Sequence, residues 1–224
     1  MLKKIGIGLA VVIVALVAVI ATRPATFHVE RSTTISAPAD IAYTQVADFH
    51  NWKGWSPWDK LDPNQKTTFT GTPGVVGSTY AWEGNDKVGA GKMTILAVKP
   101  NEEVQIKLDF LKPFESTSTT TFSFKPEGQG TKVTWSMAGD NNFAAKAMQL
   151  VMSMDSMIGK DFENGLTAMR TVSEGEAKKR AEAEAAAAKA KAEAEAKAAA
   201  EAEAAKAAEG TPSEGQKVAE PAKP

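Results

Sequence analysis

The clearest pattern in the chain is an alternation of apolar and polar residues in its central part. In EVQIKLDFLKP, residues 103–113, apolar side chains occupy every second position from Val104 to Phe110. This period of two predicts an antiparallel strand with one covered face and one solvated face. Similar but less regular alternation predicts six more strands, of which the second is the weakest, at residues 26–36, 66–71, 78–84, 91–100, 116–126 and 131–139.

Helical patterns interrupt and follow these strands. Ser36-Ala37-Pro38 predicts a helix start with a capping hydroxyl and a proline in the first turn, and this helix should end near Asp48. After Gly139, apolar residues recur every three or four positions from Phe143 to Met169, which predicts one long amphipathic helix. We therefore expect an α+β domain in which this closing helix covers the concave face of a curved antiparallel sheet.

The amino-terminal segment is uniformly apolar. Residues 5–22, IGIGLAVVIVALVAVIAT, carry no charge, and Lys3-Lys4 precede them. At about 1.5 Å per residue the run covers roughly 27 Å, close to the hydrocarbon thickness of a bilayer. A cleaved signal peptide, the alternative, normally has a shorter apolar core and a better cleavage site than IATRPATF. We therefore expect residues 1–23 to form an uncleaved transmembrane anchor.

The lysines before the apolar run also predict an orientation. Positive charge favours the cytoplasmic side, although Arg23 and Arg31 beyond the run weaken the bias. We expect a single-pass protein of the bacterial inner membrane with a cytoplasmic amino terminus and a periplasmic domain.

The carboxy-terminal segment has a different composition. Residues 174–209 are almost entirely Ala, Glu, Lys and Arg, which are strong helix formers, and opposite charges recur four residues apart. No large apolar residue provides a coiled-coil seam. We expect a solvated helical stalk over residues 174–209 and disorder over residues 210–224. Residues 24–173 then have a size typical of one domain.

Composition excludes several kinds of chemistry. The chain has no cysteine, which excludes disulfides, thiol catalysis and cysteine-based metal sites. Its two histidines are far apart, and no acidic cluster accompanies them, so we expect neither a metal nor a cofactor. Basic residues are scattered and form no stripe, so we do not expect the protein to bind nucleic acid. Phosphate-loop and Gly-x-Ser-x-Gly motifs are also missing from the sequence.

One pair of residues could act in catalysis. Asp48 and His50 lie at the predicted end of the first helix, where they could form a general base near a cavity mouth. The alternative is a helix end held by local hydrogen bonds. We assign no catalytic residue on this basis, and Asp48 and His50 are the only candidates.

Tryptophans and methionines gather in two short segments. In NWKGWSPW, residues 51–58, three of the five tryptophans lie three apart, a spacing that aligns them on one face of a turn. We expect them to seal one end of the space between sheet and helix, whereas the alternative, anchoring at a membrane interface, needs exposed rings. Methionines at 148, 152, 154 and 157 either fill a core or form a deformable ligand wall.

These segments together resemble a known superfamily. FHVERSTTISAPADIAYTQVADFHNWKGWSPW, VGSTYAWEGN, VGAGKMTI, GTKVTWSM and MDSMIGKDFENGL occur in the order and spacing typical of the START-like or SRPBCC superfamily, in its polyketide cyclase/dehydrase-type branch. The resemblance covers about residues 26–172. It implies a helix-grip fold, a curved antiparallel sheet wrapped around a long carboxy-terminal helix and an apolar cavity. Members bind lipids, sterols, polyketides or hormones, and a minority catalyse cyclisation or dehydration.

The expected function follows from this shape. We expect a membrane-tethered START-like domain that binds a hydrophobic small molecule or lipid between sheet and helix. The alternatives are a cyclase or dehydrase, and a ligand-free structural or adaptor protein of the cell envelope that recruits a partner through its tail. The side chains expected to contact the ligand are large and apolar: Trp55, Trp58, Tyr80, Trp82, Met93, Phe110, Phe122, Trp135, Met154 and Ile158.

Overall fold

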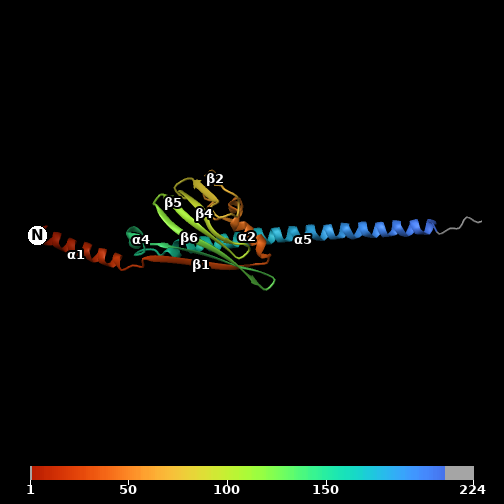
Figure 1. The fold of residues 1–224 in the computed structure, drawn as a ribbon. Helices are drawn as coiled ribbons and strands as arrows, with labels where there is room; N and C mark the ends of the chain where they lie inside the picture. The colour runs from red at the N-terminus through yellow and green to blue at the C-terminus, as the bar shows by residue number, and fades with distance from the viewer. Residues whose placement is uncertain (1, 210–224) are drawn as a thin grey trace, which may run out of the picture. The chain divides into compact units, whose positions relative to one another are not determined.

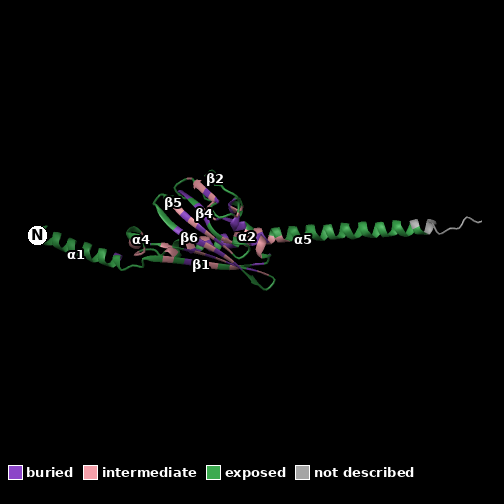
Figure 2. Ribbon diagram, viewed as in Figure 1, coloured by how far each residue is buried: buried purple, intermediate pink, exposed green. Residues whose placement is uncertain are grey.

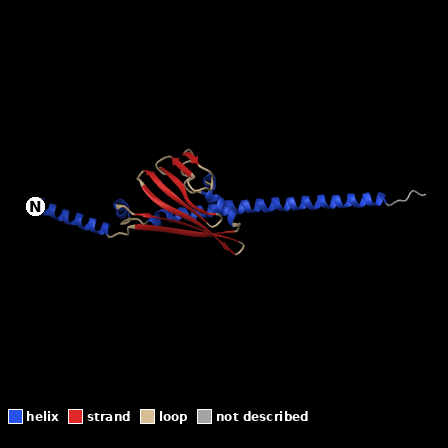
Figure 3. Ribbon diagram, viewed as in Figure 1, coloured by secondary structure: helices blue, strands red, loops and turns tan. Residues whose placement is uncertain are grey.

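The structure, a computed structural model, describes residues 2–209 (Figure 1). Its helices and strands follow one another along the chain as Figure 3 shows. They are α1 (Leu2–Ala21), β1 (Thr26–Ile35), α2 (Ala39–Ala47), the 3₁₀ turn η1 (Phe49–Asn51), α3 (Trp52–Trp55), β2 (Lys66–Thr70), β3 (Thr79–Glu83), β4 (Ala90–Lys99), β5 (Glu103–Lys112), β6 (Ser116–Glu127), β7 (Gly130–Asp140), α4 (Phe143–Met148) and α5 (Met154–Glu209).

All seven predicted strands are present and form one antiparallel sheet. The order is β1-β7-β6-β5-β4-β3-β2, so β2 to β7 run as a meander and β1 pairs with the last strand. Every second residue is buried along β5, β6 and β7, as the alternation predicts. In β4 a bulge between Ile95 and Ala97 shifts this alternation, which explains why Ile95 and Val98 both pack toward the core.

The core lies between the concave face of the sheet, α2 with the tryptophan segment, and the first turns of α5. Fully buried apolar residues come from each layer: Ile35 and Ile106 from the sheet, Val46 from α2, and Phe162 and Leu166 from α5. Figure 2 shows buried positions along the strands and helices of the domain, whereas α1 and the far part of α5 are mostly exposed. The predicted α+β helix-grip fold is therefore confirmed.

The predicted closing helix is not continuous, and this part of the prediction is wrong. α4 ends at Met148, and α5 begins only at Met154. A side chain caps the start of each helix: Asn142 Oδ1 accepts from the Ala145 amide at 2.9 Å, and the Ser153 hydroxyl accepts from the Ser156 amide at 3.1 Å. Apolar spacing continues through these local interruptions and so cannot reveal them.

The predicted hydroxyl cap of α2 is also wrong. The residue preceding the helix is Pro38, and no side chain caps it. Ser36 lies two residues too early to reach the first turn, and its backbone amide instead donates to Glu174 Oε1 at 2.9 Å.

α5 continues without a break into the Ala/Glu/Lys-rich segment. Ala177 ends the compact unit, and Lys178 begins a second one. From residue 178 to 204 every described side chain is exposed, and charged pairs such as Lys189–Glu193 recur four residues apart. Residues 210–224, for which the sequence predicts disorder, lie outside the described part of the chain.

α1 is long and apolar enough to cross a bilayer. Among the described residues it is the one helix that passes this test of length and composition. A signal sequence would pass the same test, so the finding establishes an amino-terminal apolar helix.

Candidate functional site

A cavity of about 710 Å³ separates the concave face of the sheet from the start of α5. Its wall comes from β1, from β3 to β7 with the β3–β4 and β5–β6 connections, from α3 and the loop after it, from α4, and from the first turns of α5. Most of the wall surface is apolar, although 13 of the 32 lining residues are polar or charged. This volume lies within the roughly 300–1,000 Å³ of typical small-molecule pockets.

The tryptophan segment forms the closed end of this space. Trp52 borders the cavity, and Trp55 is fully buried. Their indole N–H groups donate to carbonyls of α2, from Trp52 to Val46 at 3.0 Å and from Trp55 to Gln45 at 2.9 Å. Both rings are therefore fixed and hydrogen-bonded inside the protein, as a plug requires. Anchoring of Trp52 and Trp55 in a membrane interface is excluded, because that role needs exposed rings.

Trp135 forms the rigid centre of the cavity wall. Its ring stacks on Phe162 of α5 with centroids 4.0 Å apart, and Trp58 meets it edge-on at 5.8 Å. The Trp135 Nε1 donates to the Thr120 hydroxyl at 2.8 Å, and that hydroxyl donates onward to a backbone carbonyl. The indole N–H is thus already satisfied, so Trp135 presents only an apolar ring to the cavity.

The structure brings eight of the ten predicted contact residues to the cavity. Trp55 and Phe122 are the two that do not border it, since both are fully buried in the core, where their rings pack edge-on at 5.9 Å. The eight that line the cavity are Trp58, Tyr80, Trp82, Met93, Phe110, Trp135, Met154 and Ile158.

A polar cluster that the sequence analysis did not single out lies on one side of the cavity. Asp59 Oδ1 accepts from Gln65 Nε2 at 2.9 Å and from the Tyr80 hydroxyl at 3.4 Å. Burial, reinforced by the negative charge of Asp59, raises the pKa of Tyr80 above its ordinary value. Tyr80 therefore stays a protonated donor at physiological pH, and the remaining lone pairs of Asp59 are available to a ligand.

Asn141 adds a second polar group near the other side of the cavity. Its side chain is buried, and its Nδ2 donates to the Pro24 carbonyl at 3.1 Å. Its Oδ1 has no hydrogen-bond partner among the described residues. A buried acceptor without a partner costs about 1–3 kcal/mol, but this oxygen has almost no accessible surface and does not face the cavity.

The candidate catalytic pair lies elsewhere. His50 Nδ1 is 2.7 Å from Asp48 Oδ1, and its ring stacks on Phe69 with centroids 4.1 Å apart. The His50 side chain is more than half exposed, and neither member of the pair borders the cavity. Within the described residues, no group of three or more potential ligands could hold a metal ion.

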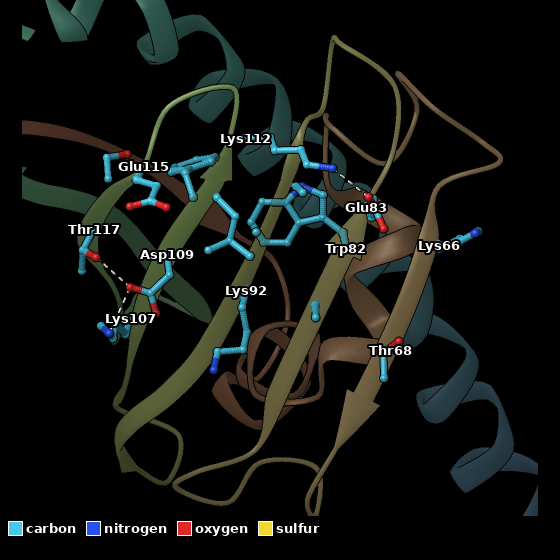
Figure 4. Close-up of a pocket in the computed structure, with 16 residues that line it drawn as sticks. Lys66, Thr68, Trp82, Glu83, Lys92, Lys107, Asp109, Lys112, Glu115 and Thr117 are labelled. Carbon is cyan, nitrogen blue, oxygen red and sulfur yellow. Dashed lines mark hydrogen bonds and ion pairs between the residues drawn. The ribbon is translucent and has the colours of Figure 1, made fainter. Parts of the chain in front are cut away.

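A second hollow, of about 930 Å³, lies against the outer face of the sheet (Figure 4). As the alternation predicts, Asp109 points to this side, where it accepts from Thr117 at 2.7 Å and pairs with Lys107 at 3.0 Å. Lys112 and Glu83 pair across the same surface at 2.9 Å. Because these charged groups satisfy one another, this hollow is a weaker ligand site than the inner cavity.

Comparisons with known proteins agree with this geometry. The family model described as polyketide cyclase / dehydrase and lipid transport matches residues 26–174. No curated protein matches the sequence.

The chain is also similar to solved structures, among them these three. Protein Ms6760 from Mycobacterium smegmatis is 20% identical, with 65% of this chain and 89% of that chain covered and a TM-score of 0.46. The Aha1 dimer from Colwellia psychrerythraea is 15% identical, with 66% and 96% covered and a TM-score of 0.49. Major latex-like protein 151 from Panax ginseng is 16% identical, with 66% and 97% covered and a TM-score of 0.46. Because the family match spans more than half of the sequence, the chain belongs to the polyketide cyclase/dehydrase and lipid transport family of the START-like (SRPBCC) superfamily.

Proposed function

We propose that this protein is a membrane-tethered binder of a hydrophobic small molecule or lipid that carries a hydroxyl or amine. One observation carries the proposal: about 710 Å³ of unfilled space lies between sheet and helix, and its mostly apolar wall includes eight aromatic and five methionine side chains. Protein interiors are packed about as densely as organic crystals and rarely leave voids larger than a water molecule. A space of this size therefore fits a guest better than a structural core.

Apolar contact would supply most of the affinity. Burial of apolar surface contributes about 25 cal/mol per Å², and the rings of Trp58, Trp82 and Trp135 offer large rigid surfaces. Met154 and Met157, at the start of α5, can adapt to guests of irregular shape.

The polar groups favour particular guests. Asp59 is an acceptor at the cavity wall, and Tyr80 already donates to it. A guest with a hydroxyl or amine can donate to this carboxylate, whereas a guest that carries a carboxylate or phosphate would be repelled by its negative charge. The lysines that border the cavity, Lys87 and Lys112, lie at its exposed edge, and Lys112 is paired with Glu83.

The tether completes the proposal. α1 would cross the inner membrane once and hold the domain in the periplasm, since its length and composition suit a span. The domain over residues 24–173 would bind the guest, and the helical segment over residues 174–209 would act as a solvated stalk. The lysines before the span support this orientation.

A cavity-filling substitution tests the proposal. Ser118 is buried on β6 and borders the cavity, so Ser118→Phe should occupy part of the guest's volume. We expect native mass spectrometry and organic extraction of the full chain, purified from its host, to show a co-purifying guest, and the variant to retain several-fold less of it.

Thr119→Phe is the matched control. Thr119 is the next residue of β6 and falls on the opposite parity, so the same side chain is added away from the cavity. If the parent chain is empty, or both variants retain as much guest as the parent, the binding role is wrong.

The other two functions receive less support. A cyclase or dehydrase built on Asp48 and His50 would need these residues at the cavity, and neither borders it. An adaptor without a guest leaves the unfilled space unexplained.

A further inference from the structure

The mouth of the cavity carries an unusual concentration of exposed apolar side chains. Val151 is 87% exposed and Phe114 is 77% exposed, although both are large and apolar. With Phe143, Met148 and Met152, which are each about half exposed, they form what we call the apolar rim. Phe114 and Met148 also line the cavity, so the rim is continuous with its interior. Exposed apolar residues that gather at one place mark an interaction surface.

The same end of the domain holds the attachment of α1. Only residues 22–25 separate α1 from β1. The carbonyl of Ala25 accepts from the Asn141 backbone amide at 2.7 Å, and the carbonyl of Pro24 accepts from the Asn141 side chain. Asn142, the next residue, caps α4, which carries two residues of the rim. These bonds fix the end of the tether beside the rim.

The length of this link limits where the domain can lie. Four extended residues span at most roughly 14 Å. A headgroup layer is roughly 5–8 Å thick on each side of the hydrocarbon core. If α1 crosses the bilayer, the end of the domain that carries the rim is held at the headgroup layer. A bilayer is therefore the apolar partner that the tether always brings to the rim.

We propose that the apolar rim inserts into the outer surface of the membrane that α1 crosses, so that the guest passes between bilayer and cavity without entering bulk water. This inference rests on the proposed tether and on the proposed ligand cavity. It makes the β5–β6 turn and the segment between α4 and α5 the two sides of the entrance. The methionines of the rim suit this role because they are apolar and flexible.

Site-directed fluorescence in vesicles tests the docking. The chain has no cysteine, so Val151→Cys or Phe114→Cys provides a single attachment point for an environment-sensitive fluorophore. Full-length protein is reconstituted into phosphatidylcholine vesicles with and without nitroxide-labelled acyl chains. We expect blue-shifted emission at both positions and quenching by the nitroxide. Val76→Cys is the control. Val76 is also exposed and apolar, but it lies just before the first residue of β3, at the end of the sheet opposite the apolar rim.

Each other outcome overturns the inference and identifies what failed. Unshifted emission at positions 151 and 114 means that the rim stays in water. A blue shift that nitroxide does not quench and that grows with protein density means that a second copy covers the rim. If the protein does not float with the vesicles after a high-salt wash, α1 does not anchor it in the membrane, and the proposed membrane-tethered function fails as well. Docking that fails while the co-purifying guest is retained contradicts this inference alone.

A second measurement tests the entry route. The double variant Val151→Asp/Phe114→Asp should take up a fluorescent apolar probe from vesicles several-fold more slowly than the parent, because charge opposes insertion. Val76→Asp should not change the rate. Equal rates for all three proteins would contradict entry from the bilayer.

Discussion

A single glycine decides how closely α5 approaches the aromatic wall of the cavity. A Cβ added at Gly165 would lie 2.8 Å from Trp135 Cζ3 and 3.3 Å from Pro57 Cδ. Trp135 cannot easily move away, because it stacks on Phe162 and donates to Thr120. Glycine in a helix is normally destabilising by about 1 kcal/mol relative to alanine, so this position gives up helix propensity for close packing.

Gly165→Ala should therefore lower the free energy of unfolding. Overpacking costs about 1–3 kcal/mol, which outweighs the propensity gain of about 1 kcal/mol. Urea unfolding of the full chain in detergent, followed by tryptophan fluorescence, measures the change. Gly175→Ala is the control in the same helix, because nothing lies within 4 Å of its added Cβ, and it should be stabilising by up to about 1 kcal/mol. Equal shifts in the two variants would contradict the packing argument.

At the scale of elements, Arg31 of β1 forms ion pairs with Asp155 and Glu163 in the first turns of α5, and we call these three residues the clasp. Arg31 donates from Nη1 to Asp155 Oδ1 at 2.8 Å and from Nε to Glu163 Oε1 at 3.0 Å. Gly159 lies beneath the guanidinium, since a Cβ there would be 2.3 Å from Arg31 Nη2. The clasped turns carry Met154 and Ile158, so the clasp holds one wall of the cavity in place.

The clasp makes this part of the structure sensitive to acid. The hydrogen bonds from Arg31 lower the pKa of Asp155 and the pKa of Glu163 below their ordinary values of 3.8 and 4.5. Groups with a depressed folded pKa stabilise the fold above their unfolded pKa, and this contribution is lost as the pH falls through the folded pKa. Arg31→Ala should therefore lower Tm at pH 7 and speed the exchange of a bound probe. The difference in Tm from the parent should shrink as the pH falls below about 4.

Lys160→Ala provides the comparison for the clasp. This variant removes an exposed charge that pairs with Glu163 at 3.4 Å, so its effect on Tm at pH 7 should be small. A difference in Tm between Arg31→Ala and the parent that is the same at pH 7 and pH 3 would show that the ion pairs are not its cause.

At the scale of the whole molecule, the fold was predictable because its main determinants are periodic. A one-residue shift in β5 would move Ile106 and Leu108 to the solvated face. The buried face of the sheet therefore requires an apolar residue at every second position, and this period is visible in the sequence. The same alternation identified the face on which Tyr80, Met93 and Trp135 line the cavity.

What could not be predicted depends on local or long-range contacts that have no period. Asp59 and Gln65 lie in an irregular loop, and only the folded chain brings them to Tyr80. Phe122 is aromatic and has the strand parity of the cavity residues of β6, and Trp55 is aromatic and follows the three-residue spacing of Trp52 and Trp58, but both rings lie deeper in the core. The start of α5 after the break is set by a single capping side chain, that of Ser153.

The carboxy-terminal boundary of the domain leads to the last prediction. The sequence places it after residue 173, where the composition changes, but contacts continue beyond that point. Glu174 Oε1 accepts from the Ser36 amide, and Glu176 Oε2 accepts from Gln45 Nε2 at 2.7 Å. Ala177 packs against the core.

Two truncations separate these boundaries. Removal of residues 178–224 should leave guest retention and the unfolding midpoint close to those of the full chain, because every contact just described is kept. Removal of residues 174–224 should lower the midpoint, since Gln45 is buried and its side-chain amide would lose its hydrogen-bond acceptor. Thermal unfolding and native mass spectrometry of both proteins measure these effects. A loss of guest in the shorter deletion would give the tail a part in binding, and equal midpoints would place the end of the folding unit at residue 173.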